Sequence, residues 1–169
     1  PEGSLWTVKN GYLFAEEESL KEIDGHLNEC SSEDLDTYRG LLEVGVHWDT
    51  QVTNEPVSRN QRVCQVFCSA LPVSYNLYSG GLWEKFAVMI LESAYEATLS
   101  AARLNCAQTK ANKVFLTMLG GGAFGNKERW ILSAIARAVR VNQRAGLDIK
   151  LVSYSQPSPM LEAFSPYDY

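Results

Sequence analysis

The stretch that decides the fold runs from Lys113 to Trp130 and reads KVFLTMLGGGAFGNKERW. A continuous apolar run, Val114 to Leu119, leads directly into a glycine-rich turn at residues 120–126, and a helical pattern begins near Glu128. In this order of strand, glycine loop and helix, backbone N–H groups and a helix N-terminus can face a bound phosphate. We therefore expect the loop to bind an anionic group.

The bulk composition excludes several classes of partner. The 169 residues suffice for one domain with a buried core, and the net charge of −5 argues against a general affinity for nucleic acid. No apolar run approaches the roughly 20 residues that cross a bilayer, so no membrane partner is expected. The two histidines and four cysteines form no ligand cluster, so neither a metal nor a cofactor is expected. The cysteines fit buried free thiols in a reducing compartment such as the cytoplasm.

The first 43 residues predict a hairpin and an acidic helical cap. Asn10-Gly11 between apolar flanks is a strong hairpin signal. Ser19 is expected to cap a short helix that runs to about Cys30, and Ser31 opens a second helix with acidic residues in its first turn. No chemistry is indicated in this region.

Strands and helices alternate over residues 44–155, the predicted core. Strands are expected at 44–53, 62–71, 114–119 and 147–153, with a long helix from Leu82 to about Cys106 and another after the glycine loop, ended by Gly146. Such alternation favours an α/β fold of three layers, α/β/α, with a mostly parallel central sheet. Ligands bind such sheets at the carboxyl ends of the strands, where the glycine loop would lie. Residues 156–169 form a tail rich in proline and tyrosine.

The chemical candidates outside the loop are few. His47 and Asp49 are two residues apart in an alternating pattern, which places them on one strand face and would suit an acid/base pair. A solvated face or a structural hydrogen-bonded pair is the simpler interpretation. Tyr75 lies in a loop that either walls a pocket or packs down on the surface. A thiol hydrolase using Cys68 is a weaker option, because no local motif activates that thiol.

A family resemblance follows from the region around the loop. The segment VFLTMLGGGAFGNKERWILSAIARAV resembles the second ligand loop of macrodomains, the ADP-ribose-binding modules. The preceding VCQVFCSALPVSYN and WEKFAVMILESAYEATLSAARLN resemble the strand, loop and helix that lead to it, so the likeness covers roughly residues 60–155. The resemblance implies a macrodomain-like fold and a set of ligand-binding residues in the loop. These are Gly120, Gly121, Gly122, Ala123, Phe124, Gly125 and Asn126, with Tyr75 nearby.

The resemblance also implies roles for the loop residues, and some features of macrodomains are missing from this sequence. Residues 121–125 would wrap a diphosphate, with Phe124 near the distal ribose. The Asn-rich loop of macrodomains and the paired glutamates of poly-ADP-ribose glycohydrolases have no counterpart in these 169 residues. The chain thus resembles the C-terminal portion of a longer macrodomain-like protein. An upstream segment of the same precursor, or a second chain, is expected to supply the remaining strands and catalytic groups.

Two functions remain open at this point. One is the binding of ADP-ribose or a related nucleotide diphosphate through loop 120–126, extended to hydrolysis of an ADP-ribosyl adduct if Asp49 or His47 activates a water. The other is a non-enzymatic structural or interaction protein that keeps a macrodomain-like fold without the ligand.

Overall fold

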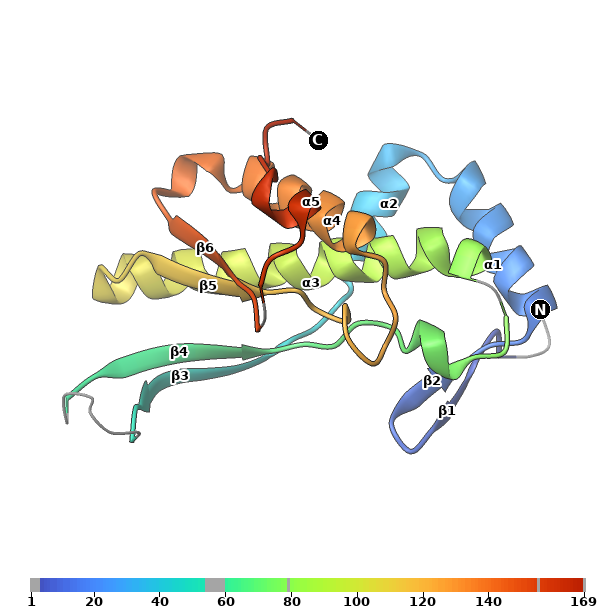
Figure 1. Cartoon of the computed structure of the whole chain (residues 1–169), viewed down its shortest axis with the longest axis horizontal. Helices are drawn as coiled ribbons and strands as arrows, with labels where there is room; N and C mark the ends of the chain where they lie inside the picture. The colour runs from blue at the N-terminus through green and yellow to red at the C-terminus, as the bar shows by residue number, and fades with distance from the viewer. Residues whose placement is uncertain (1–3, 54–59, 79, 155, 169) are drawn as a thin grey trace.

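The computed structural model describes residues 4–53, 60–78, 80–154 and 156–168. It has a mixed α/β fold, as the sequence predicts (Figure 1). In chain order the elements are β1 (Thr7–Lys9), β2 (Tyr12–Phe14), α1 (Glu17–Glu29), α2 (Ser32–Gly40), β3 (Gly45–Gln51), β4 (Arg62–Phe67), the 3-10 turn η1 (Val73–Tyr75), α3 (Gly80–Thr109), β5 (Lys113–Thr117), α4 (Glu128–Val141), the 3-10 turn η2 (Gln143–Ala145), β6 (Asp148–Val152) and α5 (Pro159–Glu162). None of the described helices combines the length and apolar character needed to cross a membrane.

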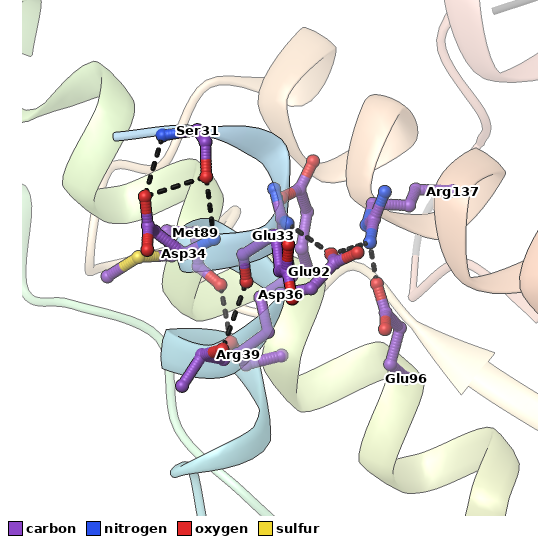
Figure 2. Close-up of polar contacts among 11 residues, drawn as sticks. Ser31, Glu33, Asp34, Asp36, Arg39, Met89, Glu92, Glu96 and Arg137 are labelled. Atoms are coloured by element: carbon purple, nitrogen blue, oxygen red, sulfur yellow. Dashed lines mark hydrogen bonds and ion pairs between the residues drawn. The ribbon is translucent and has the colours of Figure 1, made fainter. Parts of the chain in front are cut away.

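The N-terminal region confirms the predicted hairpin and both helices. Asn10 and Gly11 have φ angles of 54° and 82°, as a tight turn between β1 and β2 requires. Ser31 forms a capping box with Asp34: the Asp34 N–H donates to Ser31 Oγ at 3.2 Å, and the Ser31 N–H donates to the Asp34 carboxylate at 3.0 Å (Figure 2). The prediction that Ser19 caps α1 is wrong, because the helix already begins after Glu16.

Strand pairing differs from the expected continuous sheet. The described strands form three separate pairs: β1–β2 and β3–β4 are antiparallel, and β5–β6 alone is parallel. A mostly parallel central sheet in a three-layer arrangement is therefore not confirmed. In β5, Val114 and Leu116 are buried while Phe115 between them is 65% exposed. Buried and exposed residues thus alternate along β5, and one face of the strand is open to solvent.

A layer of helices supplies most of the core. Helix α3 is apolar around much of its circumference and packs against both α1 and α4. Trp83 and Leu91 of α3, Leu20 of α1, and Ile131 and Ile135 of α4 are almost completely buried in one cluster. Val114 and Leu116 of β5 belong to the same cluster. The strand that leads into the glycine loop therefore packs against the helices.

An ionic network joins α2 to the α3–α4 pair (Figure 2). Arg39 of α2 contacts Glu92 of α3 at 2.7 Å, and each of these side chains is only 12% exposed. Asp36 accepts hydrogen bonds from both Arg39 and Arg137 of α4, and Arg137 also pairs with Glu96 of α3 at 2.6 Å. The network fixes the acidic cap against the helical layer through charge-assisted hydrogen bonds.

A β-bulge interrupts β3. Pairing with β4 runs from Gly45↔Phe67 to His47↔Gln65 and resumes at Thr50↔Val63, shifted by one residue. Asp49 lies within the shift and has a φ angle of 51°. The strict alternation that placed His47 and Asp49 on one face therefore does not continue past His47.

Candidate functional site

Two glycines shape the loop for reasons internal to the fold. Gly120 and Gly125 have φ angles of 74° and 70°, which other residues rarely adopt. A Cβ at Gly120 would overlap Ala70 and lie 2.6 Å from Asn126 Nδ2, and a Cβ at Gly125 would lie 2.8 Å from Ser74 Cβ. These two glycines are thus required by the close approach of the loop to the segment that follows β4.

Asn126 ties the loop to that segment. Its Nδ2 donates to the Leu71 carbonyl at 2.8 Å and to the Gly120 carbonyl at 3.3 Å, and its own N–H donates to Gly120 at 3.0 Å. The side chain is 4% exposed, and its Oδ1 has no hydrogen-bond partner among the described residues. Because both carbonyls need a donor, they fix the orientation of the amide and leave Oδ1 as an unused acceptor.

Tyr95 of α3 forms hydrogen bonds to the backbone that leads from β5 into the loop. Its hydroxyl donates to the Thr117 carbonyl at 2.7 Å and accepts from the Leu119 N–H at 2.9 Å, so one side chain bridges the end of β5. Burial raises the pKa of the Tyr95 phenol well above its ordinary value, although the Leu119 hydrogen bond acts in the opposite direction. The hydroxyl therefore stays protonated and keeps both bonds.

Three successive backbone N–H groups in the loop remain unused. The N–H groups of Gly121, Gly125 and Asn126 donate to carbonyls within the loop region. Those of residues 122–124 donate to no other described group. The Phe124 N–H points away from Ser74, because the Ser74 hydroxyl binds the carbonyl of the same trans peptide, that of Ala123.

A cavity of about 600 Å³ adjoins the loop. It lies at the carboxyl ends of β5 and β6 and at the first turn of α4, the position at which parallel sheets bind ligands. Its described lining residues are Thr117, Met118, Gly121, Gly122, Asn126, Glu128, Ile131, Val152, Ser153, Tyr154, Gln156, Ser158 and Leu161.

The polar groups of this cavity are mixed in kind. Glu128 is the one Asp, Glu, Lys or Arg side chain in the described lining, and its carboxylate accepts a hydrogen bond from Ser158 Oγ. Gly122 contributes an unused N–H, whereas the unpartnered Oδ1 of Asn126 is buried from solvent. A ligand that carries both hydroxyl donors and anionic oxygens would match this set.

The predicted ligand residues divide into two groups. Gly121, Gly122 and Asn126 line the cavity. Gly120, Ala123, Phe124, Gly125 and Tyr75 do not line it, although the structure brings Phe124 and Tyr75 together. They form an aromatic cluster with Tyr12 of the hairpin, in which ring centroids lie 5.2–5.9 Å apart in edge-to-face arrangements. Phe124 thus fastens the loop to β2.

The predicted acid/base pair lies elsewhere. His47 packs edge-on against Phe67 with a centroid distance of 5.0 Å, and Asp49 lies 3.8 Å from Arg62 Nη1. Neither residue lines the cavity beside the loop. The structure therefore does not bring this pair and the glycine loop into one site.

The cysteines are free, as expected, and the Cys68 thiol is not activated. All four are half-buried thiols. Burial raises the pKa of the Cys68 thiol, with a weaker opposing effect from a hydrogen bond to Thr98, so its reactive thiolate fraction is small. Within the described residues, no group of three or more His, Cys, Asp or Glu side chains could hold a metal ion.

Most lining residues of the cavity were not expected from the sequence, and three of them carry polar groups from separate parts of the chain. Glu128, Tyr154 and Ser158 come from the helix start, the end of β6 and the tail. Only Ser158 had a local signal: Ser158-Pro159 is a helix N-cap followed by proline at the first helical position, and it opens α5.

Comparisons with protein-family models, curated proteins and solved structures find no match to this chain.

Proposed function

We propose that the cavity beside loop 120–126 binds ADP-ribose or a related nucleotide diphosphate. In this proposal the free N–H of Gly122 contacts a phosphate oxygen, and Glu128 accepts hydrogen bonds from ribose hydroxyls. The corresponding fold is macrodomain-like, with further strands completing the sheet beyond the pairs described.

Gly122 is the observation that carries the proposal. Gly120 and Gly125 are explained by backbone conformation, and Gly121 by its contact with Ile131 at 3.1 Å from a Cβ position. A Cβ at Gly122 would meet nothing within 4 Å, and its φ is not in the left-handed region. The fold itself gives no reason for glycine at a residue that lines the cavity, whereas close approach of a ligand to the backbone does.

Binding rather than turnover is proposed. A hydrolase would need a general base within reach of a water at the ligand, and His47 and Asp49 do not line the cavity. Glu128 is the only carboxylate in the described lining, and it is engaged by Ser158.

A second candidate function is supported by the charge of the cavity. Glu128 places negative charge in a cavity whose described lining has no Lys or Arg, which opposes a diphosphate. On this ground the alternative is a structural or interaction protein in which the loop only joins β5 to α4.

Titration calorimetry with ADP-ribose, ADP and AMP tests the proposal. We expect affinity in the order ADP-ribose, ADP, AMP, because each loss removes groups that match the loop N–H or the Glu128 carboxylate. Gly122→Leu should weaken ADP-ribose binding by about tenfold or more, equivalent to about 1.4 kcal/mol, by filling the approach to the backbone.

Gly40→Leu is the matched control, since a Cβ at Gly40 also meets nothing within 4 Å and Gly40 lies outside the cavity. It should leave affinity unchanged. Absence of binding heat with any of the three nucleotides at millimolar concentration, with Gly122→Leu as stable as the parent, would favour the structural alternative.

A further inference from the structure

The second feature of interest is the gap between β4 and β5. Both strands point in the same direction, and α3 connects them (Figure 1). Within the described residues β4 forms a ladder only with β3, and β5 only with β6. One edge of each strand therefore has backbone N–H and C=O groups without a ladder partner.

A cavity of about 430 Å³ separates these two edges, and we call it the inter-strand groove. Helix α3 forms its floor, and the two strands and the residues beside them form its walls. The described lining residues are Gln61, Arg62, Val63, Cys64, Val66, Thr98, Ala102, Asn105, Ala111, Lys113, Val114 and Phe115.

The groove has a shape and a charge that restrict its occupant. The carboxyl ends of the strands are held together through Asn126 and Leu71, so the groove lies toward their amino ends. Val63, Val66 and Val114 give it apolar walls. Arg62 and Lys113 are 52% and 71% exposed, and its described lining residues include no Asp or Glu. Asp49 and Asp148 pair with these cations from outside the lining, at 3.8 and 3.5 Å.

We propose that the inter-strand groove binds an extended segment of a separate polypeptide, which inserts as a β-strand between β4 and β5. Main-chain hydrogen bonds to both edges would supply affinity, as in other cases of strand addition. The segment has apolar residues at alternate positions, directed toward α3, and at least one acidic residue opposite Arg62 and Lys113. A strand of about five residues matches the length of both edges.

This proposal concerns a different site from the one proposed for nucleotides, because none of the described residues lines both the groove and the cavity beside the glycine loop.

A patterned peptide library provides the probe. Eight-residue peptides would carry Val, Ile, Leu or Phe at alternate positions and Glu, Asp, Lys, Thr or Ser between them. A control library would have the same residues at helical spacing. Peptides selected on the full chain would be synthesised, and a version with N-methylated amides along one edge would be made of each.

Cys64 gives the readout, because it lines the groove while Cys106 lines a different cavity at the end of α3. Both thiols are half-buried and free. Alkylation rates of all cysteines in the unmodified protein would be followed by mass spectrometry. Saturating peptide should slow Cys64 by about tenfold or more and leave Cys106 unchanged, as expected for protection by a bound strand. N-methylation should abolish the protection.

Charge is tested with Arg62→Glu. It should weaken binding of the acidic peptides and shift selection toward Lys-containing ones, whereas Arg144→Glu, an exposed cation outside the groove, should do neither. If no selected peptide protects Cys64, or if Cys64 and Cys106 are protected equally, the proposal is overturned. Protection of Cys64 that appears without peptide as protein concentration rises would assign the groove to a second copy and would equally overturn the assignment to a separate polypeptide.

Discussion

The two ends of β4 and β5 are built in opposite ways. At their carboxyl ends, Asn126 bonds to Leu71, Ser74 bonds to the carbonyls of Ala123 and Phe124, and Tyr95 bridges the end of β5. At their amino ends the same strands share no ladder and border the inter-strand groove. One end is therefore shaped by the chain itself, whereas the other has backbone groups that a partner could bind.

The difference gives an order of mutational sensitivity. Substitutions where the loops meet should be costly, because each side chain there satisfies several backbone groups. Substitutions of exposed residues along the groove should cost little in the isolated chain and should show their effect only in partner binding.

The largest effect is expected for Gly120→Ala, with a loss of about 4 kcal/mol in the free energy of unfolding. The left-handed backbone costs about 1–2 kcal/mol, and the overlap with Ala70 and Asn126 adds about 1–3 kcal/mol. Gly122→Ala, two residues away, should change stability by less than about 0.5 kcal/mol. Urea denaturation of both variants makes the comparison. Equal costs would contradict the division of the loop into structural and open glycines.

The attachment of α2 to the helical layer is tested by Arg39→Met, which leaves Glu92 buried and unpaired. We expect a loss of about 3 kcal/mol in the free energy of unfolding. The double variant Arg39→Met/Glu92→Met should recover most of it, because no charge remains buried. Arg129→Gln, in a more exposed ion pair with Glu84, should cost about 1 kcal/mol or less. No recovery in the double variant would show that packing, not charge pairing, holds α2 in place.

Tyr95→Phe should cost about 2 kcal/mol, because it leaves the Leu119 N–H and the Thr117 carbonyl without their partner. Its pH dependence is a further signature. The phenol pKa is raised in the folded state, so the unfolded chain loses this proton first as pH rises. The stability of the parent should then fall above about pH 10, by up to about 1.4 kcal/mol per pH unit from this one group. The slope should be correspondingly smaller in the variant, and identical slopes would contradict a buried, protonated Tyr95.

The sequence predicted local structure better than strand pairing. The Asn10-Gly11 turn, the Ser31 cap, the long α3 and the order of strand, glycine loop and helix are each encoded within a few neighbouring residues, and all were found. Which strand lies beside which depends on contacts distant in sequence. The alternation argument failed for this reason at Asp49, where a bulge set by pairing with β4 shifts the register.

The residues of the candidate site also divide into those that the local sequence predicted and those whose position depends on contacts distant in sequence. Gly121, Gly122 and Asn126 were predicted from the loop pattern and line the cavity. Tyr154 and Ser158 could not be placed there, because their position depends on how β6 and α5 return to the loop. Phe124 and Tyr75 were predicted as ligand contacts, and their edge-to-face packing with Tyr12 is a tertiary arrangement that no local motif signals.

The smallest effect on stability is expected beside the inter-strand groove. Phe115→Thr should change the free energy of unfolding by about 0.5 kcal/mol or less, because the ring is 65% exposed and threonine suits a strand. Thermal denaturation measures this directly. A loss comparable to that of Tyr95→Phe would mean that this face is already covered in the isolated chain.

Amide chemical shifts during titration with ADP-ribose test the central claim most directly. The account predicts that the largest changes fall on the amides of residues 121–126, with little change in the amides of Val63–Val66 and Lys113–Phe115 along the inter-strand groove. Saturable changes centred on the groove, or no saturable change at the glycine loop, would contradict the proposal that the loop forms the ligand site.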